Sequence, residues 1–288
     1  MVESDLIQKL SNVGETELLT LYARAIESVS KSPILKDEKA EAMIRQRDAL
    51  LRSHQSPMAR QLLRRSIDPK LVVHIALRSE RYDRYAKDFL RRHPASTIVN
   101  LGCGLDTRFF RMDDGTLTCV DIDLPEMIGL KRQLLKESTR YRMLPGSLLD
   151  HTWMGEVSKA RRPYCFMLEG VLMYLPEDEV KRLVLVLSER FPGSEMVCEL
   201  THRQWVEGFW GKLTALKMQK RTKIGSEARF QFGVSSPNEL EAWSDHIEFL
   251  EQWFYMDDDH PKIGWMRIFK LWKLFRTAQY TVHYRFSP

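Results

Sequence analysis

The sequence is poor in cysteine, and its few cysteines are far apart. Four occur in 288 residues, at positions 103, 119, 165 and 198, and no C-x-x-C pair is present. Zinc sites and redox pairs usually bring two cysteines within a few residues of each other, and disulfide frameworks are typical of short secreted chains. We therefore expect the cysteines to be small core residues rather than metal ligands or disulfide partners.

Long hydrophobic runs are also missing. No apolar stretch reaches the roughly 18 residues that a membrane-spanning helix needs. The first ten residues lack the basic start and apolar core of a secretory signal. These absences predict a cytoplasmic protein without a membrane partner.

Neither sign of charge dominates the chain. The net charge is +5 at pH 7, with 29% charged and 43% hydrophobic residues, which is an ordinary globular composition. Scattered lysines and arginines account for the excess, although the cluster KMQKRTK at 217–223 could attract an acidic partner. The length fits one large α/β domain with an inserted segment.

Residues 97–126 read as a strand, a glycine-rich turn and a second strand that ends in acids. The first strand is nearly all apolar or β-branched, which is typical of a strand buried on both faces of a parallel sheet. Gly102 and Gly104 allow positive φ angles and the close approach of a ligand. Asp121 and Asp123 stand at the tip of the second strand, where a nucleotide ribose would be bound.

A glycine pair by itself is equally typical of a plain tight turn. The strand before it, the helix start after it and the acid about 20 residues on favour a binding turn. The third glycine of the dinucleotide fingerprint is missing, however, because position 107 is Thr. The sequence therefore argues against a bound pyrophosphate such as that of NAD.

The segments NLGCGLDTRFFR and VDIDLPE resemble the leucine carboxyl methyltransferase family, whose pattern is N-L-G-x-G-x-D-T followed by an acid–Pro pair. The matching residues are Asn100, Leu101, Gly102, Gly104, Asp106, Thr107, Asp123 and Pro125. The resemblance runs from about residue 15 to the end. It implies S-adenosyl-L-methionine as cofactor and an α/β, Rossmann-like class I methyltransferase fold. We expect a seven-stranded, mostly parallel sheet with a helical N-terminal extension and a cap inserted after the fifth strand.

On this resemblance one methyltransferase domain divides into four parts. These are a helical N-terminal cover at 1–70, a cofactor-binding core at 71–200, a substrate cap at 201–236 and the C-terminal part of the sheet at 237–288. Aromatic residues between Trp205 and Phe232 would suit a flat apolar acceptor or, equally, pack against the sheet. Helices are expected over 70–92 and 129–138, among others.

The resemblance also implies the residues that bind the cofactor. Arg78 would pair with the carboxylate of S-adenosylmethionine, although an arginine on this helix could also be solvated. Ser147 stands where the family has an acid that contacts adenine, so the backbone amide of Leu148 is left to make that contact. The full predicted set is Arg78, Asn100, Gly102, Cys103, Gly104, Thr107, Asp121, Asp123, Leu124, Ser147, Leu148 and Glu169.

Glu169 follows the fourth expected strand, at the edge of the sheet where ligands bind in this fold class. The resemblance places it beside the sulfonium end of the cofactor, and Tyr174 and His202 complete the predicted catalytic set. A carboxylate acceptor is already ionised at neutral pH, whereas a phenol calls for a general base. Candidate bases are His74, His151 and His202.

The sequence thus predicts an O-methyltransferase with a small carboxylic or phenolic acceptor, first of all an aromatic or polyketide-like acid. A macromolecular carboxyl methyltransferase and a non-catalytic binding protein of the same fold remain open. Nucleic acid is disfavoured, because Glu-Gly-Val-Leu at 169–172 replaces the Asn/Asp-Pro-Pro-aromatic motif of base methylases. The run Asp-Asp-Asp-His at 257–260 reads as a solvated turn, so no metal is expected. Homodimerisation is left open.

Overall fold

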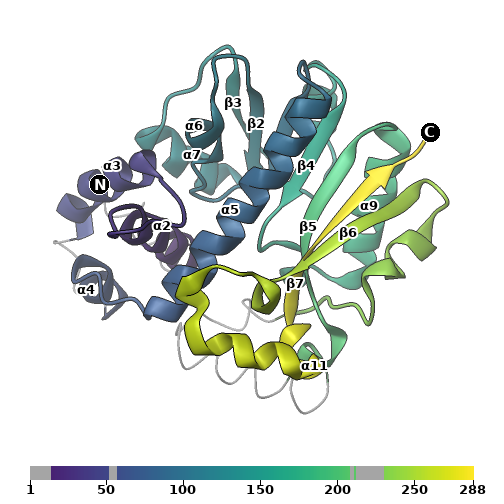
Figure 1. Cartoon of the computed structure of the whole chain (residues 1–288). Helices are drawn as coiled ribbons and strands as arrows, with labels where there is room; N and C mark the ends of the chain where they lie inside the picture. The colour runs from purple at the N-terminus through teal and green to yellow at the C-terminus, as the bar shows by residue number, and fades with distance from the viewer. Residues whose placement is uncertain (1–13, 52–56, 208–210, 212–229) are drawn as a thin grey trace.

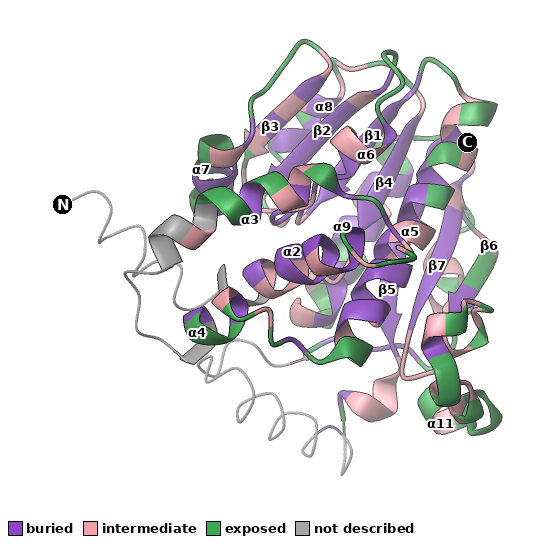
Figure 2. Cartoon of the chain, turned by 60° about the vertical axis from the view of Figure 1, so that its left-hand side comes forward, coloured by how far each residue is buried: buried purple, intermediate pink, exposed green. Residues whose placement is uncertain are grey.

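The computed structural model of the chain is a seven-stranded sheet with helices on both faces (Figures 1 and 2). It describes residues 14–51, 57–207, 211 and 230–288. Much of the predicted substrate cap at 201–236, including the basic cluster at 217–223, lies outside these residues. Within the described part of the chain, no helix combines the length and the hydrophobicity that crossing a bilayer requires.

The sheet has the order β3-β2-β1-β4-β5-β7-β6. Its strands are β1 Thr97–Leu101, β2 Thr118–Asp123, β3 Tyr141–Pro145, β4 Tyr164–Leu168, β5 Glu195–Thr201, β6 Ile247–Phe254 and β7 Gln279–Phe286. The first five strands pair in parallel, and β7 runs antiparallel to both β5 and β6. The predicted seven-stranded, mostly parallel Rossmann-like sheet is confirmed.

The described helices surround this sheet. The α-helices are α2 Gly14–Ser28, α3 Glu38–Leu51, α4 Pro57–Leu63, α5 Pro69–Arg92, α6 Arg108–Met112, α7 Pro125–Leu134, α8 Trp153–Val157, α9 Glu177–Arg190 and α11 Lys273–Arg276. The 3₁₀ helices are η1 Leu172–Tyr174, η2 Arg203–Trp205, η3 Pro237–Glu239, η4 Glu241–Trp243, η5 Tyr255–Asp257 and η6 Pro261–Leu271. The prediction of a helix over 129–138 was wrong in its bounds, because α7 spans Pro125–Leu134. Pro125, which presets φ for a first helical turn, starts α7 earlier.

Two hydrophobic cores lie on the two faces of the sheet, because successive side chains of a strand point to opposite sides. Ile98 and Cys119 pack with α2, α3, α5, α6 and α7 on one face. Val99 and Val120 pack with α8 and α9 on the other. All four cysteines are free and buried, as the sequence predicted.

Helix α5 crosses one face of the sheet along its full length (Figure 1). Asp68 caps it by accepting a hydrogen bond from the backbone nitrogen of Lys70 at 2.9 Å, and Pro69 occupies the first turn. Its apolar stripe, which includes Ile75 and Phe89, is buried against the sheet. This packing fixes the position of Arg78, which lies on the same helix.

Asp37 joins the N-terminal helices to the turn after β1. Its buried carboxylate accepts hydrogen bonds from Arg24 at 3.1 Å, Thr107 at 2.6 Å and Arg111 at 3.1 Å, and it caps α3 through the backbone nitrogen of Ala40 at 2.9 Å. Burial alone would raise the pKa of Asp37, but the charges of Arg111 and Arg24 outweigh burial and lower that pKa. Three separate segments are therefore tied together at one carboxylate.

Glu17 of α2 lies over the turn after β1. The backbone nitrogen of Leu105 donates to its carboxylate at 3.4 Å. A Cβ atom added to Gly104, whose φ is +45°, would lie 1.8 Å from Glu17 Oε2, so a side chain at this position would displace the Glu17 carboxylate. Burial and then the negative charge of Asp123 raise the pKa of Glu17 to about 7.

We expect Asp37→Asn to lower the free energy of unfolding by roughly 3–5 kcal/mol, because it leaves the buried Arg24 without its carboxylate partner and removes one of the three carboxylates that contact Arg111. Urea unfolding measures the loss. The matched control is Asp88→Asn, which removes an exposed ion pair with Arg91 and should cost less than about 1 kcal/mol. Equal effects of the two substitutions would contradict the proposed role of Asp37.

We expect Glu17→Gln to stabilise the protein increasingly as pH rises. The raised folded-state pKa means that the folded protein holds a proton that the unfolded chain releases, so wild-type stability falls between about pH 4.5 and 7. The gain of the variant over wild type should grow by roughly 1–3 kcal/mol from pH 5 to pH 8. Thermal unfolding across this range, with the exposed Glu38→Gln as control, tests the expectation. A pH-independent difference would refute it.

Candidate active site

The carboxyl ends of the parallel strands bring the candidate residues to one edge of the sheet. Gly102 follows β1, Asp123 ends β2, Glu169 follows β4 and Glu199 lies near the end of β5. The chain winds outward from β1 to β3 and then returns to add β4 on the other side of β1. In open α/β sheets ligands bind at such a reversal of strand order, and we use the word crevice for the surroundings of this point, at the carboxyl ends of β1 and β4.

The glycine turn between β1 and α6 is built around the carboxylate of Asp123. Gly102 and Gly104 have φ angles of +66° and +45°. Asp123 accepts a hydrogen bond from the backbone nitrogen of Gly104 at 2.7 Å and another from that of Leu124 at 2.8 Å. A Cβ atom on Gly102 would lie 2.6 Å from Val171 Cγ2. A turn that has no room for a side chain fits the backbone cradle that the predicted cofactor needs.

Arg78 bridges two carboxylates across the crevice. Its Nε donates to Glu169 Oε1 at 2.9 Å, and its Nη1 donates to Glu199 Oε2 at 3.1 Å. Burial alone would raise the pKa of Glu169, but the charges of Arg78 and Arg108 outweigh burial and lower it, so Glu169 is ionised. Burial does raise the pKa of Glu199, although Arg78 opposes this shift.

Arg108 holds Glu169 from the other side. Its Nη2 donates to Glu169 Oε2 at 2.6 Å, and its Nε donates to Asp83 at 2.9 Å. Ser79 donates to Glu169 as well, at 3.1 Å, so both carboxylate oxygens are engaged. Glu169 is therefore fixed in one orientation at the end of β4.

The buried charges around the crevice do not balance. The guanidiniums are those of Arg24, Arg78, Arg108 and Arg111, and the carboxylates that they contact are those of Asp37, Asp83, Asp106, Glu169 and Glu199. Five acids against four bases leave one negative charge. Glu17 and Asp123 add further acidic groups at the turn, so the crevice favours a cationic ligand.

Asn100 and Asp121 lie below this edge, on the face of the sheet that packs against α2, α3, α5, α6 and α7. Asn100 donates to Asp121 Oδ1 at 2.7 Å, and the Tyr141 hydroxyl donates to Asp121 Oδ2 at 2.6 Å. The buried Lys131 ammonium lies 2.7 Å from Asp121. The structure thus places the Asp121 carboxylate among internal partners, and Asp123 is the carboxylate at the tip of β2.

The other predicted cofactor residues occupy different environments. Thr107 is buried, and its hydroxyl donates a hydrogen bond to the Asp37 carboxylate. Cys103 is buried within the turn. Leu124 is 45% exposed beside Asp123. Ser147 and Leu148 follow β3, which brings them to the same edge, and Ser147 Oγ accepts from the backbone nitrogen of Leu149 at 3.2 Å.

Tyr174 and the candidate bases lie in different parts of the structure. Tyr174 ends η1, and burial and then the charge of Glu199 raise its pKa to about 12. His74 lies one helical turn before Arg78, and burial and then that arginine lower its pKa to about 3. His202 caps η2 through a 3.3 Å bond from Gln204, near Lys273 rather than Glu169.

His151 belongs to yet another environment. It has a φ of +57°, and its pKa is lowered by burial and then by Arg182 of α9. Of the three candidate histidines, only His74 is coupled electrostatically to Arg78 and Glu169. No cluster of three or more His, Cys, Asp or Glu residues that could hold a metal ion occurs in the described ranges.

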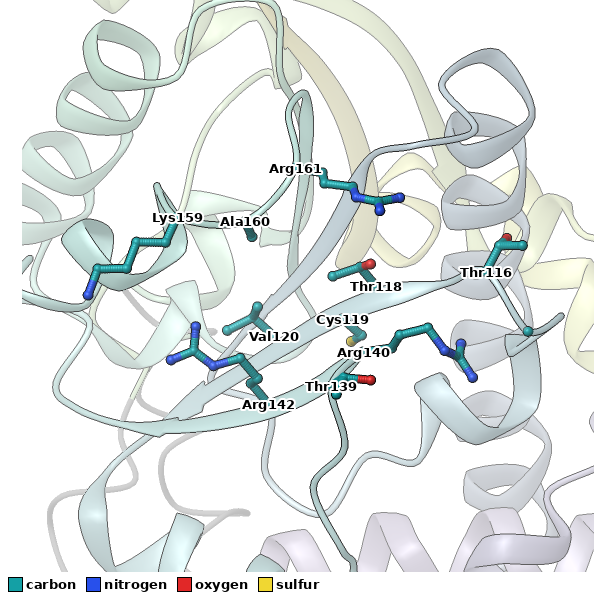
Figure 3. A pocket seen from close by; sticks show the side chains of 11 residues that line it. Thr116, Thr118, Cys119, Val120, Thr139, Arg140, Arg142, Lys159, Ala160 and Arg161 are labelled. Atoms are coloured by element: carbon teal, nitrogen blue, oxygen red, sulfur yellow. The ribbon is translucent and has the colours of Figure 1, made fainter.

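A hollow of about 580 Å³ lies at the opposite end of the strands (Figure 3). Thr118 at the start of β2 and Arg140 just before β3 contribute to its wall, together with Arg142, Lys159 and Arg161. Arg140 pairs with Asp113, and Arg142 and Lys159 both pair with Glu156. None of the predicted site residues lines this hollow, and three of its four cations are already engaged.

Sequence reasoning missed most of the charged residues that build the site. Glu17, Asp83, Arg108 and Glu199 have no local motif, and each meets its partners across long sequence separations. One signal was available for Arg108, which directly follows the Asp-Thr of the family pattern. For Glu199, its place inside an otherwise apolar strand was a second signal.

Known proteins resemble the chain over most of its length. The "Tetracenomycin polyketide synthesis O-methyltransferase TcmP" of Streptomyces glaucescens is 29% identical over 266 residues, which cover 90% of each chain. The "S-adenosyl-L-methionine-dependent methyltransferase dpfgK" of Gibberella zeae is 26% identical over 264 residues, covering 88% of this chain and 86% of the relative. A crystal structure of a DUF574 family protein from Streptomyces avermitilis shares the fold, with a TM-score of 0.57 and 14% identity over 93% of this chain and 97% of that one.

The model of one protein family matches more than half of the chain. It is described as leucine carboxyl methyltransferase and matches residues 17–187. The matched region includes the glycine turn and Asp123, whose motifs suggested the resemblance, and also Arg78 and Glu169, whose roles the resemblance implied. The chain therefore belongs to the leucine carboxyl methyltransferase family.

Proposed function

We propose that the chain is an O-methyltransferase that methylates the carboxylate of a small aromatic or polyketide-like acid. S-adenosylmethionine is the cofactor, and methyl transfer is the activity of the family to which the chain belongs. The choice of acceptor is our proposal. The observation that carries it is Glu169, which two arginines hold ionised beside the glycine turn.

The turn at 102–104, Asp123 and Arg78 would hold the cofactor. Bound there, S-adenosylmethionine would supply an electrophilic methyl group on a positively charged sulfur. Arg78 uses Nε and Nη1 for Glu169 and Glu199, and we assign its Nη2 to the carboxylate of the ligand. The surplus of acids in the crevice favours a cationic ligand. Because Arg78 and Arg108 already hold Glu169 in place, its carboxylate would face the positive sulfur without a change in its own conformation.

A carboxylate acceptor fits this site because it needs no general base, and the histidine near Arg78 is a weak one. His74, the histidine coupled to Arg78, has a pKa of about 3 and is too weak a base to take a phenol proton efficiently at neutral pH. A carboxylic acid is ionised already and needs only to be held in line with the methyl group. The similarity to a relative named as a polyketide O-methyltransferase supports an acceptor of that class.

One observation favours a phenol as the second candidate acceptor. Glu17 has a pKa of about 7, which matches the operating pH of a general base, and it lies over the glycine turn. Its charge also contributes to the raised pKa of Tyr174, which places the two side chains in one neighbourhood. Under this alternative Glu17 would take the phenol proton.

Calorimetric titration tests the cofactor site. We expect wild type to bind S-adenosylmethionine at micromolar concentration and NAD not at all. Gly102→Ala should weaken binding at least tenfold, because the new Cβ collides with Val171 at a residue whose φ is positive. Gly129→Ala, in helix α7 with open space around it, is the matched control and should bind like wild type. If wild type bound neither ligand, the turn would be structural and the scaffold alternative would stand.

Activity assays at saturating cofactor separate the two acceptors. We expect Glu17→Gln to change kcat for a carboxylic acid by less than about threefold, because no proton is transferred to a base. Glu38→Gln is the control for loss of an acid from the N-terminal helices. A loss of about 100-fold or more that follows the titration of Glu17, with activity on a phenol and none on the acid, would instead support the phenol.

A further inference from the structure

Exposed apolar side chains are concentrated in one short segment. Among the described residues, seven large hydrophobic side chains are exposed, and five of them fall within eleven positions of η6 and α11. They are Trp265, Ile268, Leu271, Trp272 and Phe275, with Leu271 at 73% and Trp265 at 63% exposure. Figure 2 shows the ribbon around α11 largely in the colours of exposed and partly exposed residues.

Three of the exposed aromatic rings lie around the ring of Phe269. The Phe269 ring lies 5.6 Å from that of Trp265, 5.7 Å from that of Trp272 and 5.4 Å from that of Phe275, measured between centroids. We call the surface of Trp265, Ile268, Phe269, Leu271, Trp272 and Phe275 the aromatic patch. An apolar surface of this kind on a folded protein usually marks an interaction site.

The aromatic patch carries two exposed lysines among its apolar side chains. The segment 261–279 contains five lysines and arginines and no acidic residue, but three of the five pair with acids of other segments: Lys262 with Glu27, Arg267 with Asp259 and Arg276 with Asp257. Lys270 and Lys273 are exposed and have no acidic partner in the part of the chain that the structure describes. The Lys70 ammonium lies over the Trp265 ring, 4.3 Å from its centroid, which brings a further cation to the border of the patch.

The patch lies at the same edge of the sheet as the glycine turn. Gln279, which begins β7 just after α11, pairs with Thr201 at the carboxyl end of β5. Trp205 of η2 donates its indole N–H to the backbone oxygen of Leu274 at 3.1 Å, which anchors the segment to the end of β5. The surface at this edge of the sheet is therefore apolar and includes the exposed Lys270 and Lys273.

We propose that the aromatic patch binds the surface of an anionic lipid bilayer. Tryptophan, phenylalanine and leucine side chains flanked by lysine and arginine are the composition of segments that lie in the membrane interface. Indole rings favour the headgroup region, and lysines near it attract anionic lipids. Such adsorption requires no spanning helix, so it is compatible with the absence of one from the described residues.

The charges favour a bilayer over a second copy of the chain. A symmetric dimer through this surface would bring Lys270 and Lys273 of one copy near those of the other, and like charges repel. An anionic surface meets the same lysines with opposite charge. Adsorption would turn the carboxyl edge of the sheet toward the lipid, from which an apolar acceptor could enter the crevice. The proposal rests on the aromatic patch alone and does not depend on the proposed reaction.

Vesicle flotation of the full chain tests the proposal. We expect the protein to float with vesicles of equal parts phosphatidylglycerol and phosphatidylcholine, to bind pure phosphatidylcholine at least tenfold more weakly, and to dissociate as salt is raised. Leu271→Ser combined with Trp272→Ser, and Lys270→Glu combined with Lys273→Glu, should each weaken binding at least tenfold. Val29→Ser, which removes an exposed apolar residue elsewhere, should bind like wild type.

Two further measurements keep the outcome interpretable. Circular dichroism and the thermal midpoint must show that both double variants are folded, and light scattering reports the oligomeric state. Wild type that stays unbound, or folded double variants that bind as tightly as wild type, would overturn the proposal. A dimer that Leu271→Ser with Trp272→Ser converts to a monomer, without vesicle binding by wild type, would show that the patch joins two copies of the chain.

Discussion

The crevice depends on buried guanidiniums that must each find carboxylates. An unpaired charge inside a protein is too costly to keep, so a buried arginine constrains every segment that supplies a partner. Asp37 is shared by Arg24 of α2 and Arg111 of α6. Glu169 is likewise shared by Arg78 and Arg108. These shared contacts tie the N-terminal helices, α5, α6 and the end of β4 to one another.

This constraint shapes the chemistry of the site. Glu169 remains ionised although it is buried, because two cations overcome the cost of burial. Glu17 forms no such pair of arginine contacts within the described residues, and burial and then the charge of Asp123 raise its pKa to about 7. Two carboxylates at one edge of a sheet thus carry different protonation properties, and the difference comes from their arginine partners rather than from their own side chains.

The sequence predicted the parts of the site whose signals are local. The strand and glycine turn at 97–104, Asp123 at a strand tip and Glu169 after a buried strand are all recognisable within a few neighbouring residues. The arginine network was not recognisable, because Arg108 meets Glu169 across 61 positions. A charged residue on an amphipathic helix looks the same in sequence whether it faces solvent or a buried acid. The helix pattern around Arg78 could therefore suggest a ligand contact but not its two internal carboxylates.

The order of the strands also constrains how the chain is made. Strand β7 is synthesised after β6 but lies between β5 and β6 in the sheet. Strand β6 therefore has no hydrogen-bonded neighbour while it leaves the ribosome, and it can join the sheet only after β7 has emerged. The parallel core from β1 to β5 can assemble earlier, as segments nearer the N-terminus generally do during translation. The open edge of β5 is exposed throughout that interval, which makes it the site where a nascent chain would need protection from aggregation.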